Sequence, residues 1–229
     1  MIQQFKSKVV SNKQLTEDVK LITFTCPDDF TFQPGQFASI ILEKDGETKL
    51  RPYSILNPPT EKGQLEIVFK LVPEGLCTPI LFEANEGDEF DLKGPMGRFL
   101  LDEKSENKGH WFIANGTGVA PFYSMLKTFL SKYPMKEFGL IFGVRHVKSL
   151  FLHENFIALD KEFDNFTYIP TCSRENWEGS MGRVQEHLPD DLSNKCFYIC
   201  GLKEMVEDTR KLLDDKGVDK SNVHFERYS

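Results

Sequence analysis

Residues 113–121 read IANGTGVAP, and this stretch decides the fold class of the second half of the chain. An apolar run precedes it and a helical pattern follows it, which is the context of a dinucleotide-binding loop between a strand and a helix. Gly116 and Gly118 would let a pyrophosphate approach the backbone, and Pro121 suits a first helical turn, where its missing N–H costs nothing. Pro121 stands near the place of the third glycine of the usual loop. An ordinary glycine-rich turn is the alternative, but the ligand-binding interpretation is favoured.

Strand and helix patterns alternate around this loop. Short apolar runs predict strands at residues 110–115, 139–144, 166–171, 195–200 and 223–228. Helical spacing of apolar residues predicts helices at residues 119–132, 150–163 and 204–216, with Gly217 as the stop signal of the last one. Such alternation predicts a parallel α/β sheet with crossover helices.

The first hundred or so residues show a different pattern. Short runs bounded by Gly, Pro or Asn predict strands at residues 19–26, 36–42, 51–56, 65–71 and 88–93, with one helix at 78–83. Strands at this spacing favour a barrel or a sandwich. A polar linker at residues 102–108 separates the two patterns, so we expect a β domain at residues 1–104 and an α/β domain at 105–229.

Composition argues against several function classes. The 229 residues carry a net charge of −7 without a cluster of Lys and Arg, so nucleic acid is not an expected partner. Five scattered cysteines suit a reducing compartment, and no apolar run suits a signal peptide or a membrane helix, so the expected location is the cytoplasm. The His and Cys spacing predicts no metal site, and neither a nucleophile elbow nor a P-loop occurs.

The first candidate ligand-binding motif is RPYS, residues 51–54. Strand alternation puts Arg51 and Tyr53 on one face, where they offer a cation for a phosphate and a flat ring for stacking. Pro52 keeps Arg51 extended. Ser54 would point to the other face, so its contact with the edge of a ligand ring needs a bend. For this motif alone, an edge strand with an exposed Arg and a half-buried Tyr is slightly favoured.

Two turns follow in the first half. PEGLCT, residues 73–78, leads into the predicted helix, whose first N–H groups are free to bind an anion. Thr78 could add a hydroxyl to that site or simply cap the helix. GPMGRF, residues 94–99, marks a tight turn at a strand end. Taken singly, the first turn is favoured as an ordinary capped helix, and the second is a weak signal that a ligand-free exit turn also explains.

Three motifs in the second half lie at predicted strands. TCSRE, residues 171–175, with Arg183 further on, offers a hydroxyl and two guanidiniums that suit a 2′-phosphate, although a solvated loop explains the spacing as well. YICG, residues 198–201, ends a strand, where Cys200 could also be a small buried hydrophobe. FERYS, residues 225–229, contains an aromatic side chain that could simply pack on the surface.

In this order, the seven motifs resemble the landmarks of the ferredoxin–NADP reductase superfamily over nearly the whole chain. The resemblance implies a β + α/β fold, in which an N-terminal antiparallel Greek-key β-barrel binds flavin and a parallel α/β domain binds the nicotinamide cofactor. It implies FAD, preferred to FMN because the turn at residues 94–99 is retained. It also implies NADP(H) as the second cofactor, with NAD(H) as the alternative.

The resemblance implies roles for individual residues. Tyr53 would stack on the flavin ring, Arg51 would hold the flavin pyrophosphate, and Ser54 would lie near the reactive flavin nitrogen. Cys200 and Glu226 would lie beside the nicotinamide and complete the catalytic set with Ser54. The other cofactor-binding positions would be Pro52, Lys70, Gly75, Leu76, Cys77, Thr78, Gly116, Thr117, Gly118, Pro121, Arg145, Ser173, Arg174, Arg183 and Tyr228.

Three groups of these positions have more definite implied partners. Residues 75–78 would cradle the flavin pyrophosphate. Residues 173, 174 and 183 match the positions that grip the 2′-phosphate in NADP-specific members. Tyr228 would cover the second flavin face; many members end on that aromatic residue, whereas Ser229 follows it here.

The expected activity is transfer of a hydride between NAD(P)H, with NADPH favoured, and bound FAD, with electron exchange to a protein partner such as ferredoxin or flavodoxin. The alternatives are a reductase for an oxygenase, a cytochrome or free flavin and, from another class, a non-redox dinucleotide sensor. The sequence has no cysteine cluster for an iron–sulfur centre, which disfavours reductases with a fused ferredoxin domain and dihydroorotate-dehydrogenase-type subunits. The acidic net charge is unfavourable for an acidic ferredoxin unless a local basic face exists. The sequence leaves the oligomeric state and the direction of electron flow open.

Overall fold

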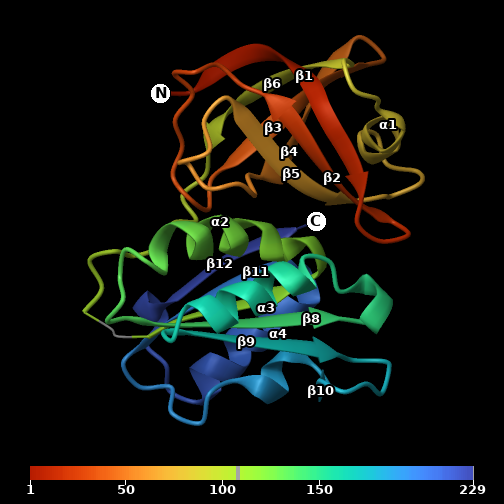
Figure 1. Ribbon diagram of the computed structural model, residues 1–229. Coiled ribbons are helices and arrows are strands. Elements are labelled where there is room, and N and C mark those ends of the chain that lie inside the picture. The colour runs from red at the N-terminus through yellow and green to blue at the C-terminus, as the bar shows by residue number, and fades with distance from the viewer. Residues whose placement is uncertain (107–108, 229) are drawn as a thin grey trace. The chain divides into compact units, whose positions relative to one another are not determined.

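The computed structural model describes residues 1–106 and 109–228, which group into two compact units (Figure 1). The first unit is Met1–Leu101 together with Ala120–Thr128, and the second is Asp102–Val119 together with Phe129–Ser229. The expected limits of independently folding domains, 1–104 and 105–229, stay a prediction.

The first unit is built on one antiparallel sheet of six strands that curls into a half-barrel (Figure 1). Its strands follow the order β4-β3-β6-β1-β2-β5. Their bounds are β1 Gln3–Gln14, β2 Val19–Thr25, β3 Phe37–Lys44, β4 Glu47–Ser54, β5 Gln64–Lys70 and β6 Glu89–Met96, with helix α1 at Thr78–Glu83 after β5. Because β6 returns to lie between β3 and β1, the connections are of the Greek-key kind.

The core of the first unit lies inside this curled sheet. Phe24, Ile40 and Ile67 are buried there, each from a different strand. β1 has no counterpart among the predicted strands because its residues are mostly polar. Its buried positions are Ser7 and Val9, so its apolar face is too small to give a period-two signal.

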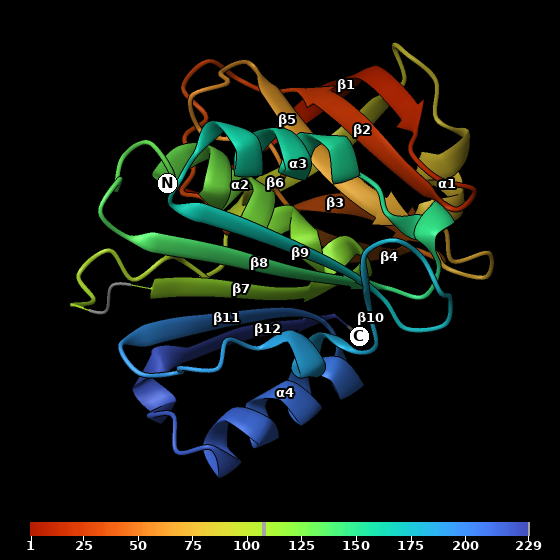
Figure 2. The ribbon, with the colours of Figure 1, turned by 60° about the horizontal axis from the view of Figure 1, so that its bottom comes forward.

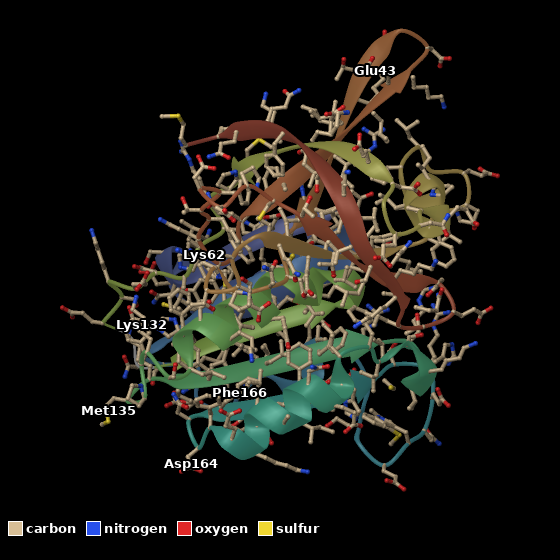
Figure 3. All side chains as sticks on the ribbon, turned by 45° about the horizontal axis from the view of Figure 1, so that its top comes forward. Glu43, Lys62, Lys132, Met135, Asp164 and Phe166 are labelled. Carbon is tan, nitrogen blue, oxygen red and sulfur yellow. The ribbon has the colours of Figure 1, made fainter. Side chains whose placement is uncertain are left out.

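The β3–β4 hairpin carries the predicted flavin-binding strand. Asp45 and Gly46 connect the two strands with φ values of 54° and 76°, the left-handed conformation of a tight hairpin turn. Near the tip, the Thr48 hydroxyl donates to Glu43 at 2.7 Å, and Figure 3 shows Glu43 on this projecting hairpin. β4 therefore begins at Glu47, four residues before the predicted start, and ends at Ser54.

The second unit is built on a parallel sheet in the order β10-β9-β8-β7-β11-β12. The strands are β7 Gly109–Asn115, β8 Glu137–Val144, β9 Phe166–Cys172, β10 Ser180–Met181, β11 Lys195–Leu202 and β12 Val223–Tyr228. The helices of the second half of the chain are α2 Ala120–Phe129, α3 His153–Glu162 and α4 Lys203–Asp215, with short 3-10 turns η1 Gly116–Val119, η2 Val147–Ser149, η3 Val184–His187 and η4 Lys220–Asn222.

Helices α3 and α4 cover opposite faces of this parallel sheet, as Figure 2 shows. On one face, Phe142 of β8 packs edge-on against Phe156 of α3, with ring centroids 6.1 Å apart. On the other face, the neighbouring residue Ile141 belongs to a core cluster with Val206 and Leu213 of α4. Each central strand is therefore buried on both sides, which explains its continuous apolar sequence.

An antiparallel β unit followed by a parallel α/β unit is the fold class that the sequence predicts, and the structure confirms it. The parallel sheet also fixes where ligands can be expected, because open α/β sheets bind them beyond the carboxyl ends of their strands. In residues 1–106 and 109–228, no helix combines the length and the apolar character that crossing a bilayer requires.

Candidate functional site

The RPYS motif forms the last four residues of β4 and pairs with β3. Arg51 lies opposite Ile40 and Tyr53 opposite Ala38. The Arg51 guanidinium is exposed, and its Nη1 donates to the Leu50 carbonyl at 3.0 Å, so the rest of this planar cation faces solvent. An exposed guanidinium that presents its other donors outward is suited to a phosphate group.

Tyr53 is held from two sides. Its ring packs edge-on against Phe69, with centroids 6.4 Å apart, and its hydroxyl donates a hydrogen bond to the buried Cys77 thiol. Burial raises the pKa of the Tyr53 hydroxyl and of the Cys77 thiol, so both groups stay neutral near pH 7. The other predicted residue of this strand end, Ser54, is buried at 5% exposure.

The turn before α1 is closed by its own residues. The Thr78 hydroxyl accepts from the Val72 N–H at 2.9 Å and donates to the Val72 carbonyl at 3.1 Å. The Gly75 N–H donates to the same carbonyl at 2.8 Å. Thr78 thus shapes the turn, while Leu76 is half-buried within it. Lys70, at the end of β5, forms an exposed ion pair with Asp18 at 2.7 Å.

The turn at residues 94–99 packs closely against β3. A Cβ added at Gly97, where φ is 102°, would lie 2.9 Å from the Phe37 ring. A Cβ added at Gly94 would lie 3.2 Å from the Ala38 Cα and Cβ. Ala38 is also the residue opposite Tyr53, so these two glycines bring the turn against the strand that supports the predicted flavin-stacking ring.

The two glycines of the dinucleotide-type loop after β7 differ in the space around them. Gly116 has a φ of 53°, and a Cβ there would meet no atom within 4 Å. A Cβ at Gly118 would lie only 2.3 Å from the Cys200 carbonyl oxygen at the end of β11. Gly118 is therefore required by packing inside the protein, whereas Gly116 leaves space beside the loop. Thr117 between them is half-buried, and Pro121 lies in the first turn of α2.

Three predicted residues meet at the ends of β11 and β12. Cys200 is fully buried and pairs in register with Glu226, and the Tyr228 hydroxyl donates a hydrogen bond to the Cys200 thiol. Burial, reinforced by the Glu226 carboxylate, raises the pKa of Cys200, and burial also raises the pKa of Glu226. The thiol is therefore a neutral, small and fixed group rather than a nucleophile.

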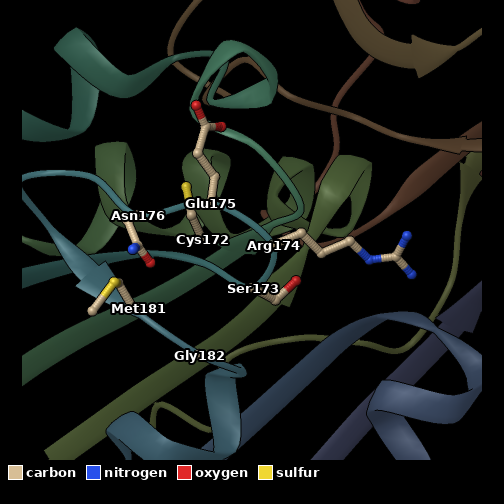
Figure 4. Close-up of a pocket in the computed structure, with 7 residues that line it drawn as sticks. All are labelled: Cys172, Ser173, Arg174, Glu175, Asn176, Met181 and Gly182. Carbon is tan, nitrogen blue, oxygen red and sulfur yellow. The ribbon is translucent and has the colours of Figure 1, made fainter.

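The predicted 2′-phosphate loop lines a pocket of about 370 Å³ at the ends of β9 and β10 (Figure 4). Its backbone is fixed to β8: the Ser173 N–H donates to the Val144 carbonyl and the Arg174 N–H to the Arg145 carbonyl, both at 3.0 Å. The Arg174 side chain points away from Asn176 and Met181, which lie on the other side of the pocket, and it is exposed (Figure 4). The lining residues are Cys172, Ser173, Arg174, Glu175, Asn176, Met181 and Gly182.

The two remaining predicted arginines have other observed contacts. The Arg183 guanidinium lies 3.7 Å from the Asp208 carboxylate of α4, and the Arg183 backbone N–H donates to Glu186 Oε1 at 2.7 Å. Arg145 contributes its carbonyl oxygen to the backbone bond with Arg174. The structure thus places Ser173 and Arg174 at the pocket, whereas Arg183 is paired with Asp208 of α4.

Two residues outside the predicted set hold these turns in place. The Asn115 side-chain oxygen accepts from the Leu202 N–H at 2.9 Å, which links the turns after β7 and β11. Glu175 Oε2 accepts from the Val147 N–H at 2.8 Å, which links the pocket loop to the turn after β8. Both residues stand inside the quoted motifs, but their partners lie 87 and 28 positions away in the sequence.

Comparison with known proteins matches each half of the chain to one family model. The oxidoreductase FAD-binding domain matches residues 6–100, and the oxidoreductase NAD-binding domain matches residues 112–211. The first range contains Arg51, Tyr53 and the turn before α1. The second contains the loop of Gly116 and Gly118 and the end of β11.

Similar proteins cover most or all of the chain. Ferredoxin–NADP reductase B from Sorangium cellulosum is 30% identical over 238 residues, which are 98% of this chain and 97% of that protein. Phenol hydroxylase P5 protein from Acinetobacter pittii is 29% identical over 237 residues, 100% of this chain and 66% of that protein. The chain spans less than two thirds of several other curated relatives.

Solved structures agree on the fold. The crystal structure of a ferredoxin NADP+ reductase from Neisseria gonorrhoeae with bound FAD and NADP matches with a TM-score of 0.87 at 23% identity, covering 98% of each chain. Taken with the near full-length match to the Sorangium cellulosum reductase, the two family models confirm the resemblance of the motif order. The chain belongs to the ferredoxin–NADP reductase family of FAD- and NAD(P)-binding oxidoreductases.

Proposed function

We propose that this oxidoreductase takes electrons from NADPH and delivers them, through bound FAD, to a protein acceptor such as a ferredoxin or a flavodoxin. The observation that carries the proposal is the arrangement at the carboxyl ends of β7 and β11, where the open side of Gly116 and the uncharged Cys200 thiol lie on neighbouring strands. When bound, FAD supplies the redox chemistry, because it accepts a hydride from the nicotinamide and can release electrons singly.

The residues of the first unit fit a flavin dinucleotide. Arg51 offers an exposed guanidinium for the pyrophosphate, and Tyr53 offers a ring that Phe69 and Cys77 hold in one orientation. Because this orientation exists before a ligand arrives, little side-chain entropy is lost when a second flat ring stacks on it. Gly75 would bring backbone close to the pyrophosphate, with Thr78 keeping the turn closed.

The residues of the second unit fit the nicotinamide dinucleotide. The space beside Gly116 allows a pyrophosphate to approach the backbone N–H groups of η1. At the end of β11, Cys200 is small and neutral, so it can lie against an uncharged ring without a desolvation cost. Glu226, which lies opposite Cys200 on β12, offers carboxyl oxygens that can accept hydrogen bonds from a nicotinamide amide.

The preference for NADPH over NADH rests on Ser173 and Arg174. A hydroxyl and an exposed guanidinium beside one pocket suit a 2′-phosphate dianion. Glu175 lines the same pocket, and its carboxylate charge would weaken phosphate binding if it pointed at the phosphate. Its Oε2 instead accepts from the Val147 N–H, which turns the negative charge toward the loop after β8.

The choice of acceptor is supported by the full-length likeness to a ferredoxin–NADP reductase. The likeness to a phenol hydroxylase P5 protein favours a second candidate, a reductase that serves an oxygenase. A cytochrome, free flavin and a non-redox dinucleotide sensor are weaker candidates. We also propose the cytoplasm as the location, because none of the five cysteines, which all lie in the described residues, is in a disulfide and four of them are buried.

The test is anaerobic titration of the purified protein with NADPH and, in parallel, with NADH. We expect a yellow protein whose flavin absorbance bleaches within seconds with NADPH and more slowly with NADH. The reduced protein is then mixed with ferredoxin, flavodoxin, cytochrome c and free FMN. Rapid reoxidation by ferredoxin or flavodoxin supports the proposal, and rapid reoxidation by free FMN alone supports a free-flavin reductase.

Two results would overturn the proposal at earlier steps. A colourless preparation that does not bind added FAD would contradict the flavin half. Binding of NADPH without any bleaching of bound flavin would identify a dinucleotide sensor instead of an oxidoreductase.

A further inference from the structure

Asn115 occupies the last position of β7, directly before the dinucleotide-type loop. Its side-chain oxygen accepts from the Leu202 N–H at 2.9 Å. Leu202 is the residue immediately before α4, so its N–H has no acceptor within that helix. The bond therefore satisfies a helix-end donor and joins two turns that are 87 residues apart in sequence.

Two glycines show how closely the turns are fitted. Gly201 has a φ of 148°, and a Cβ there would lie 1.9 Å from the Asn115 side-chain oxygen. From the same turn as Asn115, Gly118 faces the Cys200 carbonyl, which a Cβ would approach to 2.3 Å. The residues of one turn thus touch three consecutive residues of the other, Cys200 to Leu202.

We propose that Asn115 is a positioning residue that locks the pyrophosphate loop after β7 to the Cys200 turn after β11, and thereby sets where the nicotinamide is held for reaction. The proposal rests on the proposed function, because it assigns the loop to the pyrophosphate and Cys200 to the nicotinamide. These two groups are joined through a single ribose in the same half of the cofactor. Their sites must therefore keep a fixed spacing, and a misplacement of about 1 Å at a reacting atom can cost a hundredfold in rate.

The adenosine end of the cofactor would be held by other residues. Ser173 and Arg174 are fixed to the end of β8 by their own backbone bonds, whereas Asn115 is bonded to the turn after β11. Loss of the Asn115 bond should therefore change placement at the reacting end while leaving most of the binding energy intact. This separation lets placement and affinity be measured independently.

The first experiment measures the Asn115–Leu202 hydrogen bond directly and needs no cofactor turnover. Hydrogen exchange of the Leu202 amide is followed by NMR in the protein as purified and in Asn115→Ala and Asn115→Asp. We expect the alanine variant to exchange about five- to tenfold faster, because one net hydrogen bond is lost. The aspartate variant keeps an oxygen acceptor at the same position and should exchange like the wild type. Equal exchange in all three proteins would overturn the proposal.

The second experiment separates rate from affinity by stopped-flow reduction of the bound flavin over a range of NADPH concentrations. Asn115→Ala should lower the limiting rate at least tenfold and leave the NADPH dissociation constant within about twofold. Asn115→Asp should keep the limiting rate but weaken NADPH about tenfold at low salt, because its negative charge lies beside the pyrophosphate loop. A general loosening of the fold cannot produce this crossed pattern.

Asn165→Ala is the matched control. Its side-chain nitrogen donates to the carbonyls of Tyr133 and Lys136, both at 3.1 Å, in a loop away from the Cys200 turn. This variant should lower the melting temperature without changing the limiting rate. A similar rate loss in Asn165→Ala and Asn115→Ala would overturn the proposal, as would a wild-type rate in Asn115→Ala. A wild-type protein that NADPH cannot reduce would instead refute the proposed function and leave the exchange result standing.

Discussion

Gly118→Ala tests whether the dinucleotide loop and the end of β11 are as tightly packed as the structure indicates. The added Cβ would lie 2.3 Å from the Cys200 carbonyl oxygen, 2.6 Å from its carbon and 2.7 Å from the Gly201 Cα. Unbonded heavy atoms prefer a separation of about 3.5–4.0 Å, so the two backbones must move apart by about 1 Å. All three neighbours belong to the backbone, so no side chain can turn aside to relieve the contact.

The expected effects follow from that displacement. Overpacking of a closed site costs about 1–3 kcal/mol of unfolding free energy, which lowers the melting temperature of a chain of this size by about 2–12 °C. A shift of about 1 Å at the Cys200 turn should slow flavin reduction by NADPH about a hundredfold. Retention of FAD should not change, because Arg51 and Tyr53 belong to the first unit.

Thermal melts and anaerobic stopped-flow reduction measure the two effects, and Gly217→Ala is the control. Gly217 has a φ of 78°, and a Cβ there would meet nothing within 4 Å. Its substitution should cost about 1–2 kcal/mol of backbone strain without slowing flavin reduction. A Gly118→Ala protein with wild-type stability and rate would show that the loop moves freely and would refute the reasoning.

Three further predictions concern other parts of the chain. Arg174→Ala should raise the KM for NADPH about tenfold to a hundredfold through the loss of charged hydrogen bonds and leave that for NADH nearly unchanged; equal effects in steady-state assays would sink the 2′-phosphate assignment. Tyr53→Phe should lower the unfolding free energy by about 1 kcal/mol in urea titrations, because the bond to Cys77 is lost, while flavin absorbance is kept; loss of flavin would show that the hydroxyl binds it. Burial and the Lys136 ammonium lower the pKa of His110 to about 4, so the unfolded chain takes up this proton first and stability should fall as pH decreases from about 6.5 to 4. The total is about 3 kcal/mol, and His110→Gln should flatten the profile; an unchanged slope would contradict the assignment to His110.

The sequence predicts the central strands of the second unit well because β7, β8 and β11 are buried on both faces. Phe142 and Ile141 pack against opposite helix layers, so an unbroken apolar run is the necessary signal. β1 gives no such signal, since Ser7 is one of its two buried residues. A local sequence pattern therefore predicts a strand only where enough of its residues are buried to leave an apolar run or an alternation.

The candidate site shows the same limit at the level of side chains. Residue types in the motifs predict where a phosphate or a ring could bind, but tertiary partners decide which side chains are available. Asp208 on α4 pairs with Arg183, and Asp18 pairs with Lys70, although neither acid stands near its partner in the sequence. The role of Asn115 depends on Leu202 in the same way.

The order of the motifs is informative for a topological reason. In a parallel sheet every strand ends at the same edge, so the segments after β7, β9 and β11 are brought together although their strands end 30 to 87 positions apart in the sequence. One glycine turn, one Ser-Arg pair or one buried cysteine can occur in any α/β protein. If their order along the chain were changed, they would lie at different positions along that edge of the sheet. A set of weak motifs therefore specifies one site once the strand order is fixed, and the remaining precision comes from contacts such as the Asn115–Leu202 bond, which the order alone does not contain.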